Sequence, residues 1–144
     1  MNEDLFFSSE KHDWATPQIV FNELNKEFKF TIDVCASDWN AKLKNFWNLQ
    51  DNALSKDWSR HRCFMNPPYG REIKDWIKKA YQESQKGALI VALIPARTDT
   101  AYWHEYIQDK QEVRFVRGRI KFERPDGAKN SAPFPSAIVI FRNQ

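Results

Sequence analysis

The sequence predicts an α/β fold, a three-layer sandwich around a mostly parallel sheet with an antiparallel edge. Strand-like and helix-like segments alternate along the chain, which is typical of a sheet with helices on its faces. The apolar run GALIVALI at residues 87–94 is typical of a central strand buried on both faces. The chain has 144 residues, 42% of them hydrophobic, which is enough for one core. We therefore expect one domain over residues 14–144, after a flexible polar arm at residues 1–13.

The first half of the chain contributes one helix and two strands to this prediction. The helix is expected to begin with Thr16 as its N-cap and Pro17 at the first helical position. Residues 30–35 and 62–65 are short apolar or alternating runs, and each predicts a strand. Four apolar side chains are expected on the inner face of the helix: Ile19, Val20, Leu24 and Phe28.

The second half contributes two helices and three strands. Helices are expected over residues 73–85 and 100–108, on either side of the central strand at residues 87–94. Residues 113–122 and 137–141 predict two closing strands, which would form the antiparallel edge of the sheet. A polar loop that is rich in glycine and proline joins these two strands.

Three residues that end predicted strands are expected to lie on one rim of the sheet. Asp33, Asn66 and Pro95 each follow or end such a strand. In open α/β sheets, ligands bind outside the carboxyl ends of the parallel strands. The fold therefore predicts that these positions come together, although they are far apart in the sequence.

The sequence NPPY at residues 66–69 places an amide and an aromatic ring on a stiff loop. Adjacent prolines lack N–H donors and have a fixed φ, which excludes them from a helix or a central strand. The amide oxygen of Asn66 and the carbonyl oxygen of Pro67 offer two acceptors, and two convergent acceptors suit an –NH2 group. Tyr69 would supply a face on which a flat base stacks.

This arrangement favours methylation of a planar nitrogen. The exocyclic amine of a nucleobase is a poor nucleophile, because its lone pair is delocalised into the ring. Hydrogen bonds to both N–H groups favour a pyramidal nitrogen that attacks an electrophilic methyl group, and the acceleration comes from positioning and preorganised polarity. A plain turn with a packed tyrosine is the alternative. The apolar strand before the motif and the helix after it favour the functional interpretation.

Two aspartates are candidates for cofactor contact. Asp33, in FTIDVCAS, would accept hydrogen bonds from an ammonium group or ribose hydroxyls and would favour a cationic ligand. Asp51 lies about 20 residues further on, where nucleotide-binding units place a ribose-binding acid. The glycine-rich turn is missing, since Ala36 and Ser37 stand in its place. Asp33 as an N-cap and Asp51 as a surface acid remain equal alternatives.

Charge and composition permit a polyanionic partner without requiring one, because the net charge is +3 and the pI is near 8.9. Cys35 and Cys63 lie in apolar runs, and free thiols in a reducing cytoplasm are expected. No segment looks like a signal peptide or a membrane span. The histidines His12, His61 and His104 are not spaced as the ligands of a metal site are, so no metal is expected.

Six motifs occur in one order along the chain: WATP at 14–17, DVCAS at 33–37, NPPYG at 66–70, LIPARTDT at 93–100, GRIKF at 118–122 and SAPFPSAIV at 131–139. Together they resemble the phage-type DNA N6-adenine methyltransferase family, the small Dam-like enzymes of phages and prophages. The resemblance covers the chain from about Trp14 to its end. NPPY alone is less specific, because RNA adenine and protein-glutamine methyltransferases share it.

The resemblance implies a class I, Rossmann-like methyltransferase that uses S-adenosyl-L-methionine. Asp51 is a cofactor candidate from its spacing alone. The residues that match the catalytic motif are Asn66, Pro67, Pro68 and Tyr69. Those that match the two cofactor motifs are Trp14, Thr16 and Pro17 at the N-terminal end and Asp33, Cys35 and Ala36 after the first strand.

The target adenine of a duplex must be flipped out of the stack, or taken from a single strand, before such a site can reach it. Arg119, in the GRIKF motif, is the first candidate for a substrate contact, and Arg97 is the second. Arg117, Arg119 and Lys121 would share one face of the strand over residues 113–122, where they could meet phosphates or simply guard an edge strand. The loop at residues 129–136, with Ser131 and Phe134, either covers the base pocket or only connects two strands.

The resemblance implies DNA as the partner and the cytoplasm of a bacterial host as the location, with a phage or prophage as the source. All predicted elements belong to the catalytic core, so we expect a short or relaxed DNA recognition sequence, or a homodimer that supplies more DNA surface. Methylation of RNA adenine or of protein glutamine is the alternative within enzymes. A non-catalytic nucleic-acid-binding relative is the alternative outside them.

Overall fold

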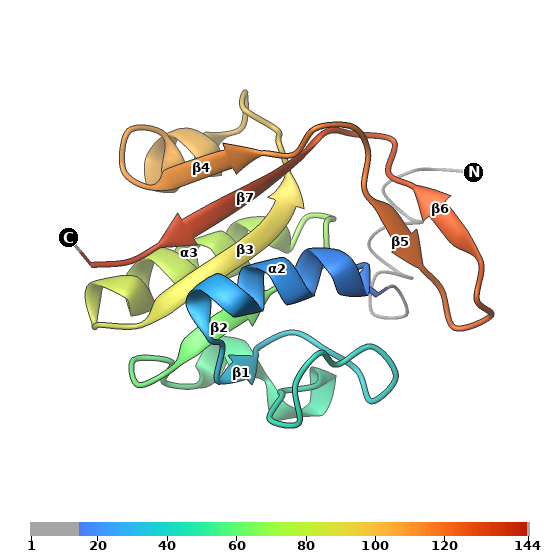
Figure 1. Ribbon diagram of the computed structural model, residues 1–144. Helices are drawn as coiled ribbons and strands as arrows, with labels where there is room; N and C mark the ends of the chain where they lie inside the picture. Colours follow the sequence, from blue (N-terminus) through green and yellow to red (C-terminus); the bar gives the residue numbers. More distant parts are fainter. Residues whose placement is uncertain (1–14, 144) are drawn as a thin grey trace.

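The computed structural model describes residues 15–143, which form a mixed α/β fold (Figure 1). The main sheet has five strands in the order β1-β2-β3-β7-β4, and β5 and β6 form a separate two-stranded hairpin. The strands of the main sheet are β1 (Ile32–Asp33), β2 (Arg62–Met65), β3 (Leu89–Pro95), β4 (Glu112–Phe115) and β7 (Ser136–Phe141). The hairpin strands are β5 (Lys121–Glu123) and β6 (Lys129–Ser131). The mixed α/β class expected from the sequence is therefore confirmed.

The closing strands form the antiparallel side of the sheet, as expected. The pairs β1–β2 and β2–β3 are parallel, whereas β7 is antiparallel to both β3 and β4. The antiparallel strand lies between β3 and the edge strand β4, which run in the same direction. Because SAIVIF is apolar or small along its whole length, both faces and both sides of this strand are suited to burial.

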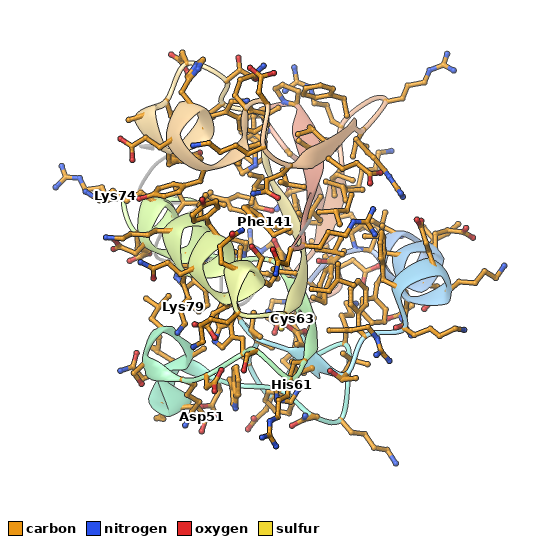
Figure 2. All side chains as sticks on the ribbon, turned by 90° about the vertical axis from the view of Figure 1, so that its left-hand side faces the viewer. Asp51, His61, Cys63, Lys74, Lys79 and Phe141 are labelled. Atoms are coloured by element: carbon orange, nitrogen blue, oxygen red, sulfur yellow. The ribbon has the colours of Figure 1, made fainter. Side chains whose placement is uncertain are left out.

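Helices cover both faces of the sheet (Figure 1). Helix α2 (Gln18–Phe28) packs its buried residues Phe21, Leu24 and Phe28 against Phe64, Val91 and Ile140 of three strands. Helix α3 (Ile73–Gln85), as expected over 73–85, covers the opposite face together with the helical turn η4 (Trp103–Ile107). Figure 2 shows Cys63 and Phe141 in the interior on the α3 side of the sheet.

The start of α2 differs from the prediction. Pro17 is the N-cap and Thr16 makes no capping bond, because the hydroxyl of Thr16 is used elsewhere. Ile19 was expected on the inner face but is 73% exposed, since Phe21 takes the sheet-facing position at the start of the helix. The spacing of Phe21, Leu24 and Phe28 by three and four residues is that of one helical face.

The predicted strand over residues 113–122 is broken into two. Strand β4 ends at Phe115, and Gly118 then adopts a φ of +76°, a conformation that glycine reaches without strain. The chain turns there and enters the hairpin at Lys121. Arg117 and Arg119 therefore lie in the connection, and the prediction that they share a strand with Lys121 was wrong.

The connection between β1 and β2 is long and includes the helical turns η2 (Leu49–Asp51) and η3 (Ala53–Ser55). Strand β1 is shorter than the predicted 30–35, because the chain leaves the sheet after Asp33 and bonds to this connection. The carboxyl ends of the neighbouring strands β1, β2 and β3 lie at one edge of the sheet. Within residues 15–143, no helix combines the length and the apolar character that crossing a bilayer requires.

Candidate functional site

Asn66 lies directly after β2 and is held by two side chains, one from the segment before α2 and one from its own NPPY loop. It is 8% exposed, and its Nδ2 donates a hydrogen bond of 3.0 Å to Oγ1 of Thr16. Its Oδ1 accepts a bond of 2.7 Å from the hydroxyl of Tyr69. The amide is thus fixed with its nitrogen toward Thr16 and its oxygen toward Tyr69.

Tyr69 is buried in this conformation, with only 1% of its surface exposed. Its hydroxyl lies 3.1 Å from the carbonyl oxygen of Leu93 at the end of β3, in addition to the bond to Asn66. Burial raises the pKa of Tyr69 well above its ordinary value, so the hydroxyl stays protonated and acts as a donor. The open stacking face expected from the sequence is absent here, because other aromatic rings cover the tyrosine.

Two phenylalanines cover the ring of Tyr69. Phe122 of β5 and Phe134 meet it edge-on, with ring centroids 6.1 Å and 5.4 Å away. The guanidinium of Arg97 lies 5.8 Å from the centre of the Phe134 ring, within the range of a cation–π contact. A base can therefore stack on Tyr69 only after these rings have moved.

A cavity of about 170 Å³ lies beside the second proline of the NPPY motif. Its wall combines the loop after β1, the connection to β2, Pro68 and the start of α3. The polar lining comes from Asn48, Asn52 and Glu72, and Trp47 and Leu49 add apolar surface. A second, more open hollow of about 400 Å³ shares Ala36, Asn48 and Leu49 with this cavity and extends it past the exposed Trp39.

Some of the residues predicted to contact a cofactor line the cavity, and others hold the loop that forms its wall. Cys35 and Ala36 line the cavity. Asp33 is 2% exposed and supports the loop, because its carboxylate accepts bonds from the backbone N–H groups of Cys35 (3.3 Å) and Lys42 (3.1 Å). Pro17 starts α2. Trp14 lies outside the described residues.

Asp51 is placed away from the cavity wall. Its carboxylate accepts a bond of 2.8 Å from the backbone N–H of Asn48 and so completes a capping box around η2. Figure 2 shows Asp51 at the lower end of the molecule, below α3. Its proposed contact with ribose stays a prediction without geometric support.

Three polar residues of the cavity escaped the sequence analysis, namely Asn48, Asn52 and Glu72. Asn52 has a φ of 52°, a left-handed conformation that asparagine tolerates better than most residues. Its place after Asp51, in the stretch LQDNAL, was the available signal. Glu72 follows NPPYG closely, and only the turn of the chain into α3 reveals that it faces the cavity.

The four candidates for substrate contact also divide into two pairs. Phe134 contacts the ring of Tyr69, and the guanidinium of Arg97 lies over Phe134. A role of the loop at residues 129–136 as the cover of a base pocket stays a prediction. Arg119 and Ser131 are exposed on the other side of the hairpin region. The second pair is therefore separated from Asn66 by the hairpin.

Comparison with known proteins adds sequence relatives to this geometry. A profile of the family described as DNA N-6-adenine-methyltransferase (Dam) matches residues 6–144. The DNA N-6-adenine-methyltransferase of Haemophilus phage HP1 is 32% identical over 117 residues, which cover 79% of this chain and 68% of that protein. The protein of the same name from Escherichia phage T1 is 30% identical over 105 residues, which cover 72% of this chain but only 44% of that protein.

A solved structure is similar in fold alone. The crystal structure of Thermoplasma acidophilum 1320 superimposes with a TM-score of 0.52 at 13% sequence identity. The match covers 100% of this chain and 99% of the other chain.

Proposed function

We propose that this chain, which belongs to the DNA N-6-adenine-methyltransferase (Dam) family, transfers a methyl group from S-adenosylmethionine to N6 of adenine in DNA. The observation that carries the proposal is the amide of Asn66, held by Thr16 and Tyr69 beside a cavity at Pro68. A class I methyltransferase fold is part of the proposal. It is supported by the rim where the parallel strands β1, β2 and β3 end.

The residues around the cavity fit the proposed cofactor. Trp47 and Leu49 offer apolar surface for an adenine ring, and Asn48 and Asn52 offer amide groups for its polar edge or for the ribose. The carboxylate of Glu72 favours a cationic ligand in the same space. When bound, S-adenosylmethionine would supply an electrophilic methyl group on a positively charged sulfur. Cys35 and Ala36 are the predicted cofactor residues that lie in this wall.

Asn66 acts on the attacking nitrogen. Its Oδ1, now bonded to the Tyr69 hydroxyl, accepts one N–H of the target amine, and the carbonyl oxygen of Pro67 accepts the other. Held in the cavity by Asn48, Asn52 and Glu72, the bound cofactor would supply its methyl group to the lone pair of N6 and would be left as a neutral thioether. The methylated nitrogen loses one proton to water. No strong base is needed, since positioning and fixed dipoles lower the barrier.

Thr16 and Pro17 do not line the cavity. Thr16 holds Asn66, and Pro17 begins α2. Thr16 accepts a bond from the Asn66 amide nitrogen, which orients the amide so that its oxygen is the atom that can exchange Tyr69 for the substrate amine. Asp33 holds the loop that carries Cys35. Asp33, Thr16 and Pro17 therefore shape the site around the ligand.

The deciding experiment measures methyl transfer from tritiated S-adenosylmethionine to DNA, RNA and protein by the purified chain. We expect the label to appear in DNA. Sequencing of DNA from cells that express the chain should also detect modified adenine. Label that appears only in RNA or only in protein glutamine would show that the substrate is not DNA. DNA binding without any binding of the cofactor in calorimetry would instead identify a non-catalytic relative.

A further inference from the structure

We propose that the β5–β6 hairpin binds the phosphate backbone of the target DNA and thereby uncovers Tyr69. This inference rests on the proposed function and assigns the DNA contact to one element. In Figure 1 the hairpin stands apart from the five-stranded sheet. Its two faces differ in chemistry. The inner face supports the covering of Tyr69, and the outer face supports the contact with DNA.

The inner face of the hairpin region is the cover of Tyr69. Side chains alternate along both arms, and the inward-facing positions are 8% exposed or less. They are Ile120 and Phe122 on one arm and Ala132 and Phe134 on the other. Because Phe122 and Phe134 contact the Tyr69 ring, the hairpin must move before a flipped base can stack there.

The outer face is cationic. The exposed side chains that alternate with the buried ones include Arg119 and Lys121 on the first arm and Lys129 on the second. Residues 116–135 contain five basic and two acidic residues, so their net charge is +3, equal to the net charge of the whole chain. A polyanion that approaches the molecule is therefore attracted to this face first. The chemistry that fits it is a row of phosphates, as on DNA.

Backbone hydrogen bonds attach the hairpin to the rest of the molecule at its base and at one place further along. Two backbone bonds close the base, from Val116 N–H to the Ser136 oxygen (3.0 Å) and from Ala96 N–H to the Pro135 oxygen (2.9 Å). Further along, Ala15 and Glu123 exchange two backbone bonds of 2.7 Å and 3.0 Å. Since Ala15 precedes the Thr16 that holds Asn66, this latch joins the hairpin to the catalytic amide.

The outer face is tested first, by the salt dependence of DNA binding. The variant Arg119→Ala/Lys121→Ala/Lys129→Ala removes three cations from that face. Each phosphate contact contributes about 0.9 to the slope of log affinity against log salt, so three lost contacts lower the slope by about 2.7. The matched control, Lys26→Ala/Arg60→Ala/Arg142→Ala, removes three exposed cations elsewhere and should keep the slope. A hairpin variant with unchanged slope and affinity for a duplex would overturn the DNA contact.

The movement is tested by locking the latch. In Ala15→Cys/Glu123→Cys the two cysteines face each other across a backbone-paired position, where Cα atoms are close enough for a disulfide. Oxidation with diamide should reduce methyl transfer to DNA by about tenfold or more, and dithiothreitol should restore it. The two single-cysteine variants control for oxidation of the native Cys35 and Cys63. Equal rates for the locked and reduced protein would overturn the uncovering of Tyr69.

The two tests separate this inference from the proposed function. If the wild-type chain methylates no substrate but the hairpin variant still loses the salt slope, the proposed reaction fails and the DNA contact stands. If the wild type methylates DNA and neither variant differs from it, the hairpin inference fails alone. If the salt slope changes but the lock has no effect, the hairpin holds DNA without acting as the cover.

Discussion

Two buried polar clusters flank the same core, and they differ in charge. On α3, the carboxylate of Glu83 is 3% exposed and accepts bonds from the Trp58 N–H (2.6 Å), Lys79 (3.2 Å) and Lys86 (2.9 Å). After β2, the amide of Asn66 is bonded, among residues 15–143, to two neutral hydroxyl groups, those of Thr16 and Tyr69. The first cluster is ionic and the second is neutral.

The difference separates a fixed connection from an exchangeable one. A buried carboxylate that loses a partner leaves a charge without compensation, so the Glu83 cluster holds the Trp58 loop on α3 permanently. A neutral hydrogen bond is exchanged for another at small net cost, so Asn66 can give up the Tyr69 hydroxyl and accept an amine. The Asn66 cluster also borders a cavity through Pro68, as a reaction site must. The difference in charge therefore separates a cluster that stabilises the fold from one whose hydrogen bonds can be exchanged.

The largest expected effect comes from Asn66→Ala. The variant loses the acceptor that faces the target amine, and we expect methyl transfer to fall by about 1,000-fold or more. Binding of the cofactor, measured by calorimetry, should stay within a factor of about two, because Asn66 does not line the cavity. Turnover like that of the wild type would refute the role of Asn66.

The next effect falls on stability. Glu83→Ala removes the acceptor of a buried N–H and of two ammonium groups. We expect it to lower the free energy of unfolding by about 3 kcal/mol, measured with urea, whereas Asn66→Ala should cost about 1 kcal/mol. Equal losses of stability in the two variants would remove the contrast between the clusters.

A smaller effect is expected for Thr16, and it decides what this residue does. Thr16→Val keeps the shape but removes the acceptor for the Asn66 amide, which can then rotate its nitrogen toward the substrate. We expect about a tenfold slower single-turnover rate, equal to about 1.4 kcal/mol, with cofactor affinity unchanged. Thr16→Ser should restore the rate. Weaker cofactor binding at an unchanged rate would instead place Thr16 at the cofactor, as its motif suggests.

The smallest predicted effect is on the free energy of unfolding at low pH. Burial alone would raise the pKa of Glu83, but the bonds from Trp58, Lys86 and Lys79 outweigh it and lower the pKa. The resulting stability is fully present above the unfolded-state pKa of about 4.3 and is lost as the pH falls through the lower folded value. Glu83→Gln should therefore lose less stability than the wild type below about pH 4 in urea titrations. The pKa values of Glu27 and Glu112 are also lowered, but these groups are present in both proteins, so their effect cancels in the comparison.

The parts of the fold that local pattern determines were predictable. The helix at Ile73–Gln85 agrees with its periodicity, and the apolar run at 87–94 corresponds to β3 (Leu89–Pro95). The position of β7 was not predictable in this way, because pairing with β3 and β4 is decided by contacts between distant segments. Gly118 was a usable signal for the break in the predicted strand, since glycine weakens a strand interior.

The residues of the candidate site were likewise predictable only in part. The predicted strands before Asp33 and Asn66 do end at the same edge of the sheet, since β1 and β2 pair in parallel. The burial of Tyr69 could not be anticipated, because it depends on where Phe122 and Phe134 of the hairpin region pack. Thr16 looked like an N-cap in the sequence, and only the structure shows its hydroxyl beside the Asn66 amide.

The place of β7 between β3 and β4 has a consequence for how the protein is made. Both neighbours leave the ribosome before residues 136–141, so each waits with an unpaired edge during translation. The NPPY loop also emerges early, on a sheet that cannot yet close. A nascent chain halted after the hairpin would expose the apolar edges of β3 and β4, which makes it a substrate for chaperones. Completion of this sheet therefore waits for the synthesis of residues 136–141.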